Sequence, residues 1–127
     1  MIRGVISQDR EIVVSILVHG PREGSVSLPA AIDTGFNGYL TLPPNAINAL
    51  ELPYHSQATA TLGDGSVVSL RRFEGSVDWH GQRREAMILE AEGGPLIGVS
   101  LLYGSRLIID FADDGQVVIE PLDTIPP

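Results

Sequence analysis

Short hydrophobic segments separated by glycine and proline run through the whole sequence. Residues 12–18 form a nearly uninterrupted run of β-branched and aliphatic side chains, too short for an ordinary helix, which predicts a buried strand. In residues 56–62, small or aliphatic side chains alternate with threonines, which is the two-residue period of a strand. The Asp-Gly pairs at 64–65 and 114–115 favour tight turns. The pattern predicts a mostly antiparallel β domain.

The same criteria predict further strands and two short helices. The additional strands are expected at residues 26–33, 39–42, 67–70, 75–79, 85–90, 106–111 and 116–120. Residues 44–50 are expected to form a helix because proline suits its first turn and Pro53 follows its end; residues 98–103 are expected to form another, closed by Gly104. The length of 127 residues argues for a single domain over 1–127, with a loose proline-rich tail at 121–127.

Charge and composition narrow the class of protein. The net charge of −8 disfavours partners bound through phosphates, so neither nucleic acid nor an anionic membrane is an expected partner. Cysteine is absent, and His19, His55 and His80 lie in separate segments, so we expect no metal site and no cofactor. No apolar run reaches the roughly 18 residues that span a bilayer, and the first residues lack the apolar stretch of a signal peptide. These features predict a cytoplasmic protein.

The candidate chemistry lies in residues 30–43, where a run of small and apolar residues leads to one carboxylate, Asp33. Thr34, Gly35, Asn37 and Gly38 follow and form a turn signal. An aspartate at such a place has a structural interpretation, because its carboxylate often accepts hydrogen bonds from the following backbone amides. The Asp-Thr-Gly tripeptide alone is therefore weak, and its context decides between a turn and a site.

In context, this stretch resembles the active-site loop of the retropepsin-like (clan AA) aspartic proteases, in which an apolar strand ends in Asp-Thr-Gly. Leu96, Ile97 and Gly98 resemble the apolar-apolar-Gly element that these proteases carry late in the chain, before a short helix. The turn of Gly63, Asp64, Gly65 and Ser66 stands where the family has its flap. The order of these elements covers nearly the whole chain. The resemblance implies an all-β fold, a closed acid-protease barrel with one or two short helices.

The resemblance also implies a function. Asp33 would be the catalytic residue of an endopeptidase that hydrolyses peptide bonds through two carboxylates. Because the chain has a single Asp-Thr-Gly, the second carboxylate would come from another copy in a symmetric homodimer. Thr34 would hydrogen-bond across the two-fold axis, and Gly35 would let the backbone approach the carboxylate. Gly63 and Gly65 would let the flap bend over an extended peptide, whereas Asp64 is expected to be only a turn residue.

Two departures leave a second function open, and the second of them favours a bacterial or cellular relative over a viral one. Phe36 stands where the family often has alanine or serine, and its ring is expected to narrow the cleft or to line a substrate pocket. Val99 and Ser100 follow Gly98, where retroviral members carry arginine and a polar residue. The alternative is therefore a catalytically weak or silent module of the same fold that binds peptides or a partner protein.

Two further expectations concern the surface. By analogy with the family, the terminal segments 1–7 and 116–122 are candidates for the contact between copies. The basic pairs Arg71-Arg72 and Arg83-Arg84 are interpreted as solvated residues of strand edges or loops, not as a binding patch.

Overall fold

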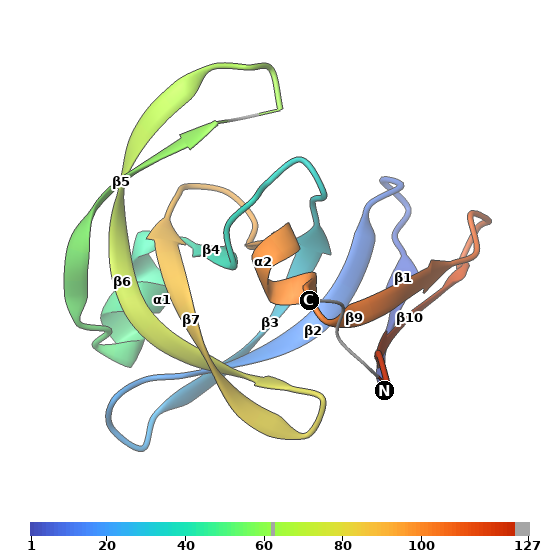
Figure 1. Cartoon of the computed structure of the whole chain (residues 1–127), viewed down its shortest axis with the longest axis horizontal. Coiled ribbons are helices and arrows are strands. Elements are labelled where there is room, and N and C mark those ends of the chain that lie inside the picture. Colours follow the sequence, from blue (N-terminus) through green and yellow to red (C-terminus); the bar gives the residue numbers. More distant parts are fainter. Residues whose placement is uncertain (62, 124–127) are drawn as a thin grey trace.

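The computed structural model describes residues 1–61 and 63–123, which form one ten-stranded mixed sheet and two short helices. A closed ring of hydrogen-bonded strands lies at its centre (Figure 1): β2 (Ile12–His19), β3 (Ser25–Ile32), β8 (Leu96–Ile97), β4 (Leu40–Leu42), β7 (Gln82–Glu90) and β6 (Val67–Trp79). Pairing of β2 with β6 at Val18–Val77 and His19–Ser76 closes the ring. Within it, β3–β8 and β4–β7 are parallel. The prediction of a mostly β closed barrel is confirmed.

The remaining strands extend the sheet beyond the ring. β5 (Tyr54–Thr61) pairs with β6 and forms a long hairpin with it, and β1 (Ile2–Ile6), β10 (Gln116–Pro121) and β9 (Ser105–Ile109) continue from β2. Helix α1 (Pro44–Leu50) has its predicted bounds, and α2 (Val99–Leu102) lies inside the predicted 98–103. Neither helix, among the residues described, has the length and apolar character needed to cross a membrane.

The core lies inside the ring. Val14, Ile16 and Val18 of β2 are almost fully buried, while Ser15 between them is exposed. β2 therefore buries one face, and its sequence hides this alternation because the outward positions 13 and 17 are also apolar. The core residues of the other strands and of α2 that are fully buried include Leu40, Leu42, Val77, Ile88, Ile97, Leu101, Val117 and Ile119.

Strand boundaries differ from the prediction where a strand changes partner. β6 is continuous through Arg71–Glu74, which was not predicted, because the stretch passes from pairing with β5 to pairing with β7. Phe73 pairs with Tyr54 on one side and Ile88 on the other. β1 was also not predicted as a strand. The strands predicted at 26–33 and 106–111 end earlier, at Ile32 and Ile109.

The two terminal segments are internal strands of this sheet. β1 is paired on one edge with β2 and on the other with β10, and β10 is paired with β1 and β9. A contact between copies through these segments would therefore use their faces. The prediction of a loose tail is wrong at its start: Pro121 ends β10, and the Leu122 N–H donates to the Gly104 carbonyl at 3.0 Å. Residues 124–127 of that predicted tail lie outside the described residues.

Candidate active site

Asp33 follows directly after β3 and is fixed by its backbone and its side chain. Its N–H donates to the Ile97 carbonyl at 2.9 Å, and its carboxylate Oδ1 accepts the Gly35 N–H at 2.9 Å. A Cβ at Gly35 would lie 3.2 Å from that oxygen, so glycine allows the amide to come this close. Asp33 is half-buried, and Thr34 and Gly35 are exposed. The carboxylate is thus oriented at the surface of the barrel by a short rigid turn.

The late apolar-apolar-Gly element packs directly against this turn. Leu96 and Ile97 form β8, which lies between β3 and β4. The Leu96 N–H donates to Thr41 Oγ1 at 2.9 Å, and the Gly98 N–H donates to the Tyr39 carbonyl at 3.0 Å. Both ends of the loop that carries Asp33 are therefore hydrogen-bonded to one short strand. Two motifs more than sixty residues apart in the sequence therefore form one unit.

Phe36 lies between two glycines of this unit. A Cβ at Gly38 would lie 2.5 Å from Phe36 Cζ, and a Cβ at Gly98 would lie 2.7 Å from Phe36 Cδ2. The ring is 9% exposed and packs with Ala58 of β5 and Leu89 of β7 in a small hydrophobic cluster beside the main core. The lack of side chains at Gly38 and Gly98 is what makes room for the phenyl ring at position 36.

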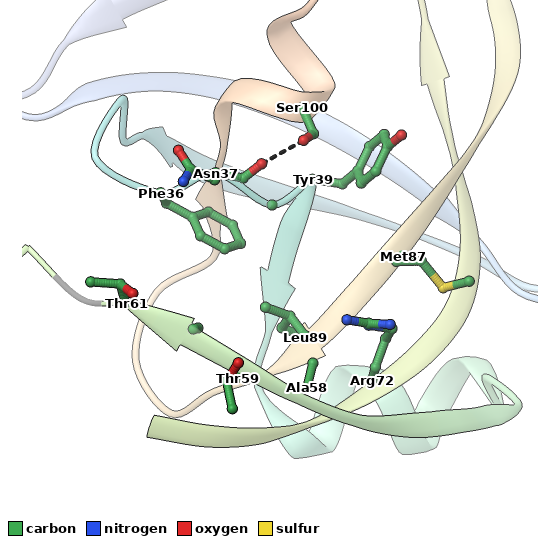
Figure 2. Close-up of a pocket in the computed structure, with 12 residues that line it drawn as sticks. Phe36, Asn37, Tyr39, Ala58, Thr59, Thr61, Arg72, Met87, Leu89 and Ser100 are labelled. Atoms are coloured by element: carbon green, nitrogen blue, oxygen red, sulfur yellow. Dashed lines mark hydrogen bonds between the residues drawn. The ribbon is translucent and has the colours of Figure 1, made fainter. Parts of the chain in front are cut away.

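A cavity of about 480 Å³ lies next to this ring, between the loop and the β5–β6–β7 part of the sheet. We call it the recess (Figure 2); it is lined by Phe36, Asn37, Gly38, Tyr39, Ala58, Thr59, Ala60, Thr61, Arg72, Met87, Leu89 and Ser100. The Ser100 hydroxyl donates to the Asn37 carbonyl and ties α2 to the rim. Of the site residues predicted from the sequence, Phe36 lines the recess. Asp33 does not, since the lining begins three residues after it.

The tip of the β5–β6 hairpin is an exposed turn. It extends beyond the barrel on the side where the loop after β3 lies (Figure 1), and Gly63, Asp64, Gly65 and Ser66 are all exposed. Asp64 Oδ1 accepts the Ser66 hydroxyl at 2.6 Å and the Ser66 N–H at 2.9 Å. These bonds, the hydroxyl first, lower the pKa of Asp64. Gly65 has φ +86°. Asp64 therefore serves the turn, as predicted, and the tip residues do not line the recess.

Arg84, one residue of the two basic pairs, makes contacts that the sequence did not predict. Arg84 of β7 is half-buried, and its guanidinium donates to the Leu101 carbonyl at 2.8 Å and the Ser100 carbonyl at 3.1 Å. Its Cζ lies 5.7 Å from the centre of the Tyr39 ring. Interpreting Arg84 as a solvated residue was wrong, because it caps the carbonyls of α2. An arginine thus packs on this helix, although Val99 and not an arginine stands directly after Gly98 in the sequence.

Sequence reasoning missed most of the recess. The alternation of Ala58 and Ala60 in β5 was the one available signal, because two small side chains on one face leave space above a sheet. Arg72, Met87 and Leu89 come from other strands, and only the register of β6 with β5 and β7 brings them to the same face. Within the described residues, no three His, Asp or Glu side chains are grouped as a metal ion would require.

Solved structures of aspartic proteases share this fold. A retropepsin-like aspartic protease from Rickettsia conorii matches with a TM-score of 0.59 at 14% identity, over 94% of this chain and 90% of that one. The EIAV protease, complexed with the inhibitor HBY-793, matches with a TM-score of 0.51 at 15% identity, over 76% of this chain and 88% of that one. The chain therefore has the retropepsin-like fold over most of its length, which confirms the resemblance seen in the sequence. A scan of protein-family models and a search of curated proteins found no match.

Proposed function

We propose that the protein is an aspartic endopeptidase that acts as a homodimer, with one Asp33 from each subunit. The observation that carries the proposal is the environment of Asp33: an oriented carboxylate beside exposed Thr34 and Gly35, on a retropepsin-like fold. An Asp33 that served only a turn would not require this whole arrangement, in which β8 braces the loop from a distant part of the chain.

The chemistry follows from placing two such carboxylates together. Two carboxylates within hydrogen-bonding distance cannot both ionise cheaply, so the pair retains one proton. The ionised Asp33 takes a proton from a water held between the two, and that water attacks the scissile carbonyl carbon. The protonated Asp33 donates its proton to the carbonyl oxygen as the tetrahedral intermediate forms. The intermediate then collapses: the C–N bond breaks, the leaving nitrogen takes the proton that came from water, and a hydroxyl proton of the intermediate passes to the other Asp33, so that the pair again holds one proton.

The first test is turnover of a mixed peptide library by wild type and by Asp33→Asn, at pH values between about 3 and 7. The substitution retains the size of the side chain and removes its acid–base function, so we expect a loss of at least about 100-fold. Asp113→Asn is the matched control, because that carboxylate is exposed in the turn between β9 and β10. Activity that survives in Asp33→Asn would eliminate the mechanism.

A mixing experiment tests the requirement for two copies. If both carboxylates are needed, activity follows the square of the wild-type fraction, so an equal mixture with Asp33→Asn at constant total protein retains about a quarter of the activity. Once the subunits have exchanged, a fall to only about half would mean that each subunit acts independently, and retention of about three quarters would mean that one carboxylate per dimer suffices. Sedimentation of the wild type should reveal a dimer, and a strict monomer with full activity would contradict the proposal.

The alternative is a silent module of the same fold that binds peptides. It is favoured by the position of the recess, whose lining begins at Phe36 and does not include Asp33. The two functions differ in turnover. If the protein is a binding module, wild type and Asp33→Asn bind peptides with equal affinity, and neither of them hydrolyses the peptides.

A further inference from the structure

The recess contains one charged side chain, Arg72 of β6. Arg72 is half-buried and pairs with Ser56 of β5 and Leu89 of β7, and residues directly opposite on paired strands share a face. Figure 2 shows its guanidinium beside Leu89 and Met87 on the wall of the recess. In the part of the chain that the structure describes, no carboxylate forms an ion pair with Arg72.

The neighbouring arginine has the opposite environment. Arg71 points to the other face of β6, where Nε and Nη2 donate to the two carboxylate oxygens of Glu90 at 3.0 and 2.8 Å. This pair raises the pKa of Arg71, with the hydrogen bond to Glu90 as the largest cause. The chain therefore neutralises the arginine outside the recess with its own carboxylate, and leaves the one inside the recess to face a cavity.

We propose that the recess binds an acidic side chain, glutamate or aspartate, of an extended peptide, and that the guanidinium of Arg72 holds its carboxylate. This inference rests on the proposed function and deepens it, because it assigns a substrate class to a recess whose lining begins three residues after Asp33. A guanidinium presents a planar set of N–H donors that matches the geometry of a carboxylate. The other described residues of the lining are apolar or neutral and polar, and none of them carries a negative charge.

The overall charge of the protein does not oppose this assignment at close range. The net charge of −8 repels an acidic peptide, but salt at physiological ionic strength largely screens this repulsion between charges more than about 8 Å apart. A carboxylate in contact with Arg72 interacts over a much shorter distance and is partly shielded from water by Phe36, Leu89 and Met87. Local charge inside the recess therefore decides which side chain it accepts.

The test uses positional-scanning libraries of acetylated and amidated peptides, about eight residues long, that fill an extended cleft. One position at a time is fixed as Glu, Gln or Lys, and the others are mixtures of uncharged residues, so each carboxylate present belongs to a side chain. Binding is measured with the Asp33→Asn protein and cleavage with the wild type. At one position we expect Glu to be preferred over Gln by about 10-fold, the strength of a partly buried charged hydrogen bond.

Variants of Arg72 and of its neighbour Arg71 test whether the preference for Glu depends on Arg72. Arg72→Gln should reduce the preference for Glu over Gln to about one, and Arg72→Glu should make Lys the preferred residue at that position. Arg71→Gln, the matched control, should leave the preference unchanged. The inference is overturned if no position prefers Glu, if the preference survives Arg72→Gln, if Arg71→Gln abolishes it equally, or if no library binds.

The two proposals fail in different ways. Cleavage by the wild type without any preference for Glu would refute the acidic subsite and leave the endopeptidase intact. Binding with a preference for Glu that depends on Arg72, but without cleavage, would support the subsite and refute the endopeptidase.

Discussion

The ring of Phe36 fills the space that a side chain at Gly98 would occupy, since a Cβ there would lie 2.7 Å from Phe36 Cδ2. The same hypothetical Cβ would lie 2.1 Å from the Gly38 carbonyl oxygen. The loop after Asp33 and the start of α2 are therefore packed backbone against backbone, with the phenyl ring beside the contact. This packing makes the identity of three residues interdependent.

The first prediction concerns Gly38. The three atoms nearest to a Cβ at this position all belong to the Phe36 ring, with Cζ at 2.5 Å and Cε1 at 2.6 Å. Gly38→Ala should therefore lower the free energy of unfolding by about 1–3 kcal/mol in wild type, and by clearly less in a Phe36→Ala background. Urea unfolding of the two single variants and the double variant gives a coupling energy, which we expect to be about 1 kcal/mol or more.

Gly98→Ala is the matched comparison for that cycle. Its clash with the Gly38 carbonyl oxygen involves backbone, which cannot swing aside, so the loss of stability should persist when Phe36 is alanine. Equal coupling of Phe36 with Gly38 and with Gly98 would contradict this account.

Arg84 and Arg83 offer a prediction from adjacent residues. Arg84 donates to the Ser100 and Leu101 carbonyls, whereas Arg83 is exposed. Arg84→Gln should lower the free energy of unfolding by about 1.5–3 kcal/mol, because it leaves two carbonyls of α2 without their charged donor. Arg83→Gln should change it by less than about 0.5 kcal/mol. Thermal or urea unfolding of both variants checks this, and equal effects would refute the role assigned to Arg84.

His80 should make stability depend on pH. Burial, then the N-terminal ammonium group and Arg84, lower its pKa below the ordinary value of 6.5. Between that value and the lower folded value, the unfolded state binds more protons than the folded state. The free energy of unfolding contributed by His80 therefore falls as the pH falls below 6.5 and levels off below the folded pKa. At higher pH the imidazole is neutral in both states.

His80→Asn isolates this effect, because asparagine tolerates the φ of 54° at this position. Urea unfolding of both proteins at pH values from about 5 to 8 should give a smaller loss of stability on acidification for the variant. Identical slopes for the two proteins would mean that His80 does not contribute. This measurement also defines the acidic range in which activity assays report on folded protein.

The two glycines of the hairpin tip should respond differently to alanine. Gly65 has φ +86°, whereas Gly63 has no such backbone requirement, and neither would bring a Cβ near another atom. Gly65→Ala should cost about 1–2 kcal/mol of local stability, and Gly63→Ala should be neutral or slightly stabilising. Hydrogen exchange of the β5 and β6 amides reads out this local stability. If Gly63→Ala loosens the hairpin as much as Gly65→Ala does, the turn conformation is not the cause.

Much of the fold was predictable because local patterns coincide with tertiary structure. The Pro residues around α1 and the Asp-Gly of the hairpin specify backbone conformation directly. The order of Asp33, the hairpin and Leu96–Gly98 identified the fold. β1 and the middle of β6 were missed because their strand character comes from partners distant in sequence. Three of the four residues in Arg71–Glu74 are charged, and the stretch continues as strand because β5 and β7 flank it.

The candidate site was predictable only where its residues adjoin Asp33. Phe36 was recognised as a departure, but the reason that it fits, two glycines sixty residues apart, lies in the packing of β8 on the loop. Arg71 and Arg72 are adjacent residues of the same type, and the pleat of β6 directs one to Glu90 and the other to the recess. No property of a single residue distinguishes them, since their difference depends on which strands stand opposite.

β5 contributes one wall of the recess and is bonded, among the described strands, to β6 alone. The outer part of this hairpin, residues 57–61 of β5 with residues 67–71 of β6, can therefore bend as a two-stranded ribbon without breaking a hydrogen bond of the barrel ring, because β6 pairs with β7 only from Arg72 onward. The opposite side of the recess, which is formed by the loop after Asp33 and by β7, would stay in place while β5 moves. A bulky peptide segment could then enter the recess when the hairpin bends, without any change in the position of the Asp33 carboxylate.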